Sequence, residues 1–147
     1  MTEPTDLSPS AFFPLDEDAC FERLGQTSLG RIVLSLDALP EMFPVQYALL
    51  GRDPVFRTIP GHKLTGAADG QVLCMGIDEF DAEARIGWRV LVTGPAQRLT
   101  TAADLTAAAA LPLKPWVGET DGFVRISAAL VRGTELRGST APSARGG

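Results

Sequence analysis

The stretch PVQYALLGRDPVFRTIPGHKL, residues 44–64, decides how this chain folds. An apolar segment, residues 42–50, is followed by the turn Gly-Arg-Asp-Pro and by a second β-prone segment, residues 55–58. Two such segments joined by a turn are typical of an antiparallel hairpin. Pro44 lies near the start of the first segment and predicts an edge or a bulge there, because proline donates no ladder hydrogen bond.

The end of this stretch gathers groups that suit a phosphate. Arg57 offers a planar pair of N–H donors, Thr58 a hydroxyl and Lys63 a compact positive charge. Gly61 permits close backbone approach, and a helix beginning near His62 would direct free N–H groups to the same place. The spacing predicts either a site for a terminal phosphate or a surface turn with solvated cations, and it does not separate the two.

Other segments complete an all-β pattern with small helices. Asp16 is a suitable N-cap for a helix through Leu24, and alanine-rich residues 102–111 have high helix propensity. Residues 62–68 have room for one or two helical turns. Apolar alternation predicts further strands at residues 30–36, 71–77, 87–99 and 123–136, with polar connections at 36–41 and 78–85. Strands at such short spacing predict a mainly β, antiparallel barrel of about six strands.

Length and charge narrow the class of protein. The 147 residues fit one domain at 15–137, between a flexible N-terminal tail at 1–14 and a flexible C-terminal tail at 138–147. The net charge of −5 and the lack of a basic stripe argue against a nucleic-acid partner. No apolar run is long enough to span a bilayer and no secretory signal is present, so we expect a cytoplasmic protein without a membrane partner.

Cysteines and carboxylates give no metal pattern. Cys20 and Cys74 are expected to be buried free thiols, because cytosolic thiols stay reduced. Neither has the spacing of a zinc site. The acidic cluster of residues 78–83 is interpreted as a solvated hairpin (Asp78, Glu79, Asp81 and Glu83). We therefore expect no metal ion.

Residues 44–64, together with IDEFDAEARIGWRVLVTGPA at residues 77–96, resemble the pyridoxamine 5′-phosphate oxidase-like family. The pattern is Pro-Val-x-Tyr, Phe-Arg-Thr-x-x-Gly-x-Lys-Leu, Asp-Glu-Phe-Asp and Gly-Trp-x-Val-x-Val-x-Gly. It is similar to the short actinobacterial flavin-binding members, a group that includes nitroimidazole-resistance proteins. The resemblance covers about residues 15–137.

The resemblance implies a split β-barrel that forms a homodimer and holds flavin mononucleotide (FMN) at the dimer interface. It assigns phosphate contacts to the turn after the hairpin and contacts with the flavin ring to the preceding strand. Trp88 would lie near the same site. The alternative interpretation, which the sequence favours equally, places Trp88 in the barrel core. The implied cofactor-binding residues are Val45, Gln46, Tyr47, Arg57, Thr58, Gly61, His62, Lys63, Leu64 and Trp88.

The chain departs from the family pattern at three places. The turn has Gly-His-Lys where relatives usually have Gly-Thr-Lys, Gly76 replaces a common side chain, and Asp-Gly-Phe replaces a common Asp-His-Trp. His62, the one histidine, is open to two interpretations. It titrates near neutrality and so suits a proton donor, but we prefer a turn residue that donates to phosphate.

The implied function is an FMN-dependent oxidoreductase acting on a small molecule that the sequence does not identify, and no catalytic residue is assigned. One alternative is a binding protein that uses the same barrel for a deazaflavin coenzyme or haem. Another is a non-catalytic dimer with a vestigial pocket. The N-terminal carboxylates at residues 16–22 would repel the long acidic tail of a deazaflavin, so we expect FMN to bind more tightly.

Overall fold

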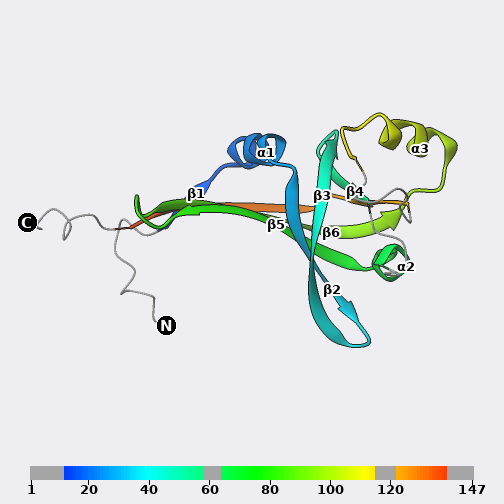
Figure 1. The fold of residues 1–147 in the computed structure, drawn as a ribbon, viewed down its shortest axis with the longest axis horizontal. Helices are drawn as coiled ribbons and strands as arrows, with labels where there is room; N and C mark the ends of the chain where they lie inside the picture. The colour runs from blue at the N-terminus through cyan, green and yellow to red at the C-terminus, as the bar shows by residue number, and fades with distance from the viewer. Residues whose placement is uncertain (1–11, 58–63, 115–121, 139–147) are drawn as a thin grey trace, which may run out of the picture.

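The computed structural model describes residues 12–57, 64–114 and 122–138, which form eight strands and three short helices (Figure 1). The strands are β1 (Phe12–Leu15), β2 (Leu29–Leu36), β3 (Leu39–Leu50), β4 (Asp53–Arg57), β5 (Val72–Asp81), β6 (Ile86–Arg98), β7 (Phe123–Ile126) and β8 (Leu130–Arg137). The helices are α1 (Glu17–Gln26), α2 (Leu64–Ala68) and α3 (Ala102–Ala109).

Six strands close into an antiparallel barrel. β2 lies between β3 and β5, β3 pairs with β4, β4 with β7, and β6 joins β7 to β5. The predicted fold class, a mainly β antiparallel split barrel of about six strands with a few short helices, is confirmed. β8 and β1 lie outside this ring and extend the sheet past α1 (Figure 1).

The barrel is split because β6 changes partner along its length. Residues 86–93 pair with β8, whereas residues 96–98 pair with β7. Gly94 and Pro95 lie at the change, and the Ser127 N–H donates to the Pro95 carbonyl (2.9 Å). A Cβ atom at Gly94 would overlap the carbonyl oxygen of Ser127. The change of partner therefore requires glycine at position 94.

The hairpin predicted from residues 44–64 is present as β3 and β4, with Gly51 at a φ of +66° in the turn. β4 pairs with β3 only from Tyr47 onward, while Pro44 pairs with Arg31 of β2. Pro44 thus lies in the part of β3 that pairs with β2 but not with β4. Proline donates no ladder hydrogen bond, so it fits a part of the strand that has a paired neighbour on one side only.

Three element boundaries differ from the prediction. The connection predicted at 36–41 is a two-residue turn in which Asp37 and Ala38 have φ values of 52° and 67°, so β3 already begins at Leu39. β5 continues to Asp81 because residues 78–81 pair with β6 despite their charge. The strand at Phe12–Leu15 begins inside the predicted tail, since it pairs with β8.

Helix α1 packs against the sheet beside β8 and begins as predicted, with the Asp16 carboxylate accepting from the Ala19 N–H (2.8 Å). Cys20 and Leu24 of α1 are buried in the main core. Both cysteines are free, but Cys74 is only partly buried because it lies on the outward side of β5. No described helix has the length and apolar character to cross a membrane.

Gly94→Ala should lower the free energy of unfolding by about 3 kcal/mol, because the new methyl group forces β6 away from the Ser127 carbonyl. Urea unfolding monitored by circular dichroism would measure the change. Gly66→Ala is the matched control, since a Cβ atom there meets nothing within 4 Å in helix α2. An equal effect of both substitutions would show that the change of partner tolerates a side chain.

Candidate functional site

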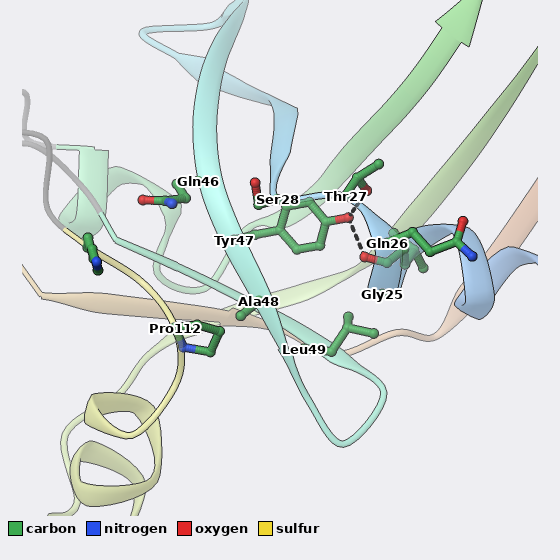
Figure 2. A pocket seen from close by; sticks show the side chains of 11 residues that line it. Gly25, Gln26, Thr27, Ser28, Gln46, Tyr47, Ala48, Leu49 and Pro112 are labelled. Carbon is green, nitrogen blue, oxygen red and sulfur yellow. Dashed lines mark hydrogen bonds between the residues drawn. The ribbon is translucent and has the colours of Figure 1, made fainter.

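A cavity of about 590 Å³ lies beside β3, between the end of α1 and the segment that follows α3 (Figure 2). One wall comes from residues 24–28, the centre from residues 46–49, and the opposite wall from Pro112 and Lys114. Figure 2 shows Pro112 across the cavity from the α1 end, with β3 between them. Segments distant in the sequence therefore meet at one pocket, which we call the β3 pocket.

Alternation along β3 separates the core from this pocket. Val45 and Tyr47 are buried in the barrel core, at 6% and 1% exposure. Gln46 and Ala48 alternate with them, are partly exposed and line the β3 pocket. Among the three strand residues predicted to contact the cofactor, Gln46 is thus the one whose side chain lies on the outward face.

The hydroxyl of Tyr47 ties β3 to the end of α1. It donates to the Leu24 carbonyl (2.7 Å) and therefore acts as the acceptor in its 2.5 Å contact with the Thr27 hydroxyl (Figure 2). The Arg23 carbonyl, 3.2 Å from the Thr27 hydroxyl, is the alternative acceptor for the same Thr27 proton. These bonds satisfy carbonyls at the helix end and hold residues 25–28 as a pocket wall.

Burial raises the pKa of the Tyr47 phenol, and the hydrogen bond from Thr27 opposes that rise in part. Desolvation disfavours the phenolate, so the folded state keeps the proton at a pH where the unfolded chain releases it. At physiological pH Tyr47 is therefore neutral, and its hydroxyl links β3 to the end of α1 by hydrogen bonds.

Arg57 supports the opposite wall. Its guanidinium donates to the Leu113 carbonyl (3.3 Å) and lies 4.7 Å above the ring of Phe123. Leu113 is buried between the two residues of the second wall, Pro112 and Lys114. The same side chain thus connects β4, β7 and the segment after α3.

The charge of the β3 pocket comes from a single side chain. Among its described lining residues Lys114 carries the one charge, and none is a carboxylate. The polar groups around it are two amides and three hydroxyls, from Gln26, Gln46, Thr27, Ser28 and Tyr47. The pocket can therefore accept an anion together with a ligand that hydrogen-bonds to amides.

The predicted site residues do not all meet here. Gln46 and Tyr47 line the β3 pocket, and Arg57 reaches its wall through Leu113. Leu64 is buried in the core at the start of α2. Thr58, Gly61, His62 and Lys63 lie outside the described residues, so their contacts with a cofactor stay predictions.

Trp88 lies in a different hollow of the chain. It is 8% exposed, belongs to the main core cluster and packs under the guanidinium of Arg23, 4.9 Å from the ring centroid. Glu79 and Glu135 line the same hollow. Within one chain Trp88 is therefore separate from the β3 pocket, and its role in cofactor binding stays a prediction.

Sequence reasoning missed the two walls of the pocket. The polar run Gln26-Thr27-Ser28 lies at the end of α1, and only the docking of α1 against the sheet brings it beside β3. Lys114 follows helix α3 and Pro112. The sequence marked it as a possible site residue only through the rarity of lysine in this chain. Among the described residues, no group of three or more metal-ligating side chains is placed to hold a metal ion.

The free energy of unfolding should fall as pH rises above about 10, the ordinary pKa of tyrosine. The unfolded chain then loses the Tyr47 proton while the folded chain retains it, so the stabilisation is complete below pH 10 and is lost above it. Tyr47→Phe should remove this part of the pH dependence. Because Tyr47 is the one tyrosine, the phenolate absorbance titrates it directly. A native titration at the denatured-state pKa would contradict burial of the phenol.

Comparison with known proteins identifies the family. Residues 16–135 match the family described as pyridoxamine 5′-phosphate oxidase. An uncharacterized protein of Mycobacterium tuberculosis is 31% identical over 128 residues, which cover 83% of this chain and 84% of that protein. The solved FAD-binding protein from Mycobacterium smegmatis is 30% identical, with a TM-score of 0.74 over 85% of this chain and 98% of that one.

A solved FAD- and haem-binding protein from Mycobacterium smegmatis shares the fold at 14% identity, with a TM-score of 0.66 over 93% of this chain and 80% of that chain. The family match spans the described barrel from the N-cap of α1 to near the end of β8. The chain therefore belongs to the pyridoxamine 5′-phosphate oxidase-like family of split β-barrels.

Proposed function

We propose that this protein binds a flavin nucleotide in the β3 pocket and acts in the cytoplasm as an oxidoreductase on a small molecule. The observation that carries the proposal is the pocket itself, which joins amides, hydroxyls and one cation at the outward face of β3. An isoalloxazine ring presents carbonyl and N–H groups at one edge and a broad apolar surface elsewhere. A nucleotide adds phosphate, for which the pocket has a cation.

The residues present fit such a ligand. The amides of Gln46 and Gln26 would hydrogen-bond to the ring edge, while Pro112 and Leu49 offer apolar contact. Arg57, with Thr58 and Lys63, remains the phosphate site that the family resemblance implies. We propose FMN as the cofactor, and the FAD-binding relative makes FAD the first alternative to test.

A bound flavin would supply the hydride or electron chemistry. This chain would bind and orient the ring with Gln46, hold its wall rigid through the Tyr47 hydrogen bonds, and restrict water at the buried side of the pocket. Tyr47 keeps its own proton in this arrangement, because burial raises its pKa.

Haem is a weaker candidate for this pocket. A haem iron is usually held by histidine, cysteine, methionine or a tyrosine oxygen. The described lining has no histidine, cysteine or methionine, and the Tyr47 hydroxyl is bonded to Leu24 and Thr27. A deazaflavin coenzyme stays an alternative, since its ring offers similar hydrogen-bonding groups.

The proposed partner is a second copy of this chain, seated on the outward face of the sheet. Val33 of β2 lies opposite Met42 of β3 and Cys74 of β5, and the register continues from Cys74 through Thr93 to Leu130. Directly paired residues share a face. The exposed apolar side chains of this outer apolar face are Leu29, Val33, Met42, Val72 and Leu130.

The outer apolar face reaches the pocket. Leu29, 56% exposed, pairs with Gln46, which lines the β3 pocket. Exposed apolar side chains gathered on one face are typical of an interaction site, although Arg31 lies between Leu29 and Val33 on this face, and two-fold dimers are the commonest closed assemblies. A homodimer through this face would bring the second chain to the edge of the flavin site.

Gln46→Ala should weaken flavin binding by about 1 kcal/mol, because one amide partner of the ring is lost. Titrations with FMN and FAD, followed by flavin fluorescence, would measure this change. Gln97→Ala, at an exposed position of β6, is the matched control and should bind like the parent protein. Failure of the parent protein to bind either flavin would refute the proposed function.

Met42→Glu should convert the dimer to a monomer, because it places a charge at a side chain that is 62% exposed in one chain and covered in the pair. Sedimentation at micromolar concentration would compare it with the parent protein, expected at twice the mass of one chain. Leu105→Glu on α3 adds the same charge at an exposed apolar residue away from this face. A monomeric parent protein would contradict the dimer.

A further inference from the structure

The two walls of the β3 pocket differ in how firmly they are attached to the barrel. The α1 wall is held by the hydrogen bonds of Tyr47 and by two α1 residues, Cys20 and Leu24, that are buried in the main core. Helix α3, which precedes the opposite wall, lies outside the ring of strands (Figure 1) and has one buried residue, Ala108. Segments with few buried apolar contacts open locally at a lower free energy than the core does.

A small core cluster, separate from the main core, attaches residues 100–114 to the barrel, and we call these residues the α3 segment. The segment contributes Ala108 and Leu113 to the buried part of this cluster. The barrel contributes Val55 and Leu99, and the Leu99 N–H donates to the carbonyl of the first residue of β7 (3.0 Å). The start of the segment is therefore fixed by backbone bonding, whereas the rest is held mainly by two apolar side chains.

The pocket wall lies at the carboxyl end of the α3 segment. Pro112 lines the cavity between Leu111, which is partly buried, and Leu113, which is buried (Figure 2). The Leu113 N–H donates to the Leu111 carbonyl (2.7 Å), so Pro112 is the central residue of a tight turn. Arg57 of β4 donates to the Leu113 carbonyl (3.3 Å) in this arrangement. A movement that takes Leu113 out of its cluster therefore carries Pro112 away from the pocket.

We propose that the α3 segment is a lid over the β3 pocket, with Leu99 at its fixed end and Leu113 as its latch, and that its opening sets the rate at which flavin leaves. The inference rests on the proposed flavin function and adds a gate to that same site. The described structure is the closed position, in which Leu113 is 6% exposed. A closed lid holds the cofactor and separates it from water, and release then waits for the lid to open.

Hydrogen exchange followed by mass spectrometry tests the opening in the whole protein, with and without flavin. In the protein alone, amides of α3 should exchange through local opening, at a rate that low urea concentrations leave unchanged. Amides of α1 should exchange only through global unfolding, which urea promotes. FMN at ten times its dissociation constant should slow exchange in α3 roughly tenfold, because it stabilises the closed lid. Exchange in α3 that requires global unfolding, or that bound FMN leaves unchanged, would overturn the lid.

Removal of the latch tests whether the opening controls release. Leu113→Ala should raise both the exchange rate of α3 and the dissociation rate of FMN at least tenfold, because a buried leucine side chain is lost. Leu105→Ala is the matched control, since it shortens an exposed leucine of the same helix and should change neither rate. Faster exchange without faster FMN release would contradict the gate. Should Leu113→Ala fail to fold, Leu111→Ala shortens a partly buried leucine of the same cluster and should raise both rates by a smaller factor.

The outcomes separate the lid from the flavin function. A protein that binds FMN while exchange in α3 is unchanged keeps the proposed function and loses the lid. A protein that binds neither FMN nor FAD loses the proposed function, and the lid over flavin fails with it. If FAD binds and FMN does not, the same exchange and release measurements with FAD decide the lid.

Discussion

The close approach of β6 to the Ser127 carbonyl is the constraint on which the structure depends. At Gly94 the strand leaves β8 and joins β7, and this exchange closes six strands into a ring while β8 and β1 continue outside it. No side chain fits at that point. A chain without this exchange would leave β7, and through it β4, without a link to β6, and the hairpin that carries the pocket would lose its closed support.

Closure also gives β3 two different environments. Its inward residues fill the barrel, and its outward residues face a pocket whose walls come from α1 and from the segment after α3. Tyr47 belongs to both, since its ring is buried while its hydroxyl holds the α1 end. Stability of the core and shape of the candidate site are therefore coupled through one side chain, and a change to either one affects the other.

Local patterns predicted most of the fold because they depend on neighbours in the sequence. The Asp16 cap, the hairpin of residues 44–64 and the apolar alternation of β2 are examples. The polar end of β5 was missed, since its pairing with β6 overrides its charge. Gln46 was predicted as a site residue, but Lys114 and Thr27 were not, because docking of distant segments places them beside β3.

The order of the strands in the chain has a consequence during synthesis. β4 and β7 pair through Val55 and Arg125, which are 70 positions apart. On the ribosome the β3–β4 hairpin is therefore made well before its closing partner, which emerges 70 residues later. Until then the nascent sheet is open along β4, and its core-facing residues are accessible to other chains. Folding should therefore be late and slow, as expected for a topology dominated by distant pairings, and helper proteins would have time to bind the unfinished barrel.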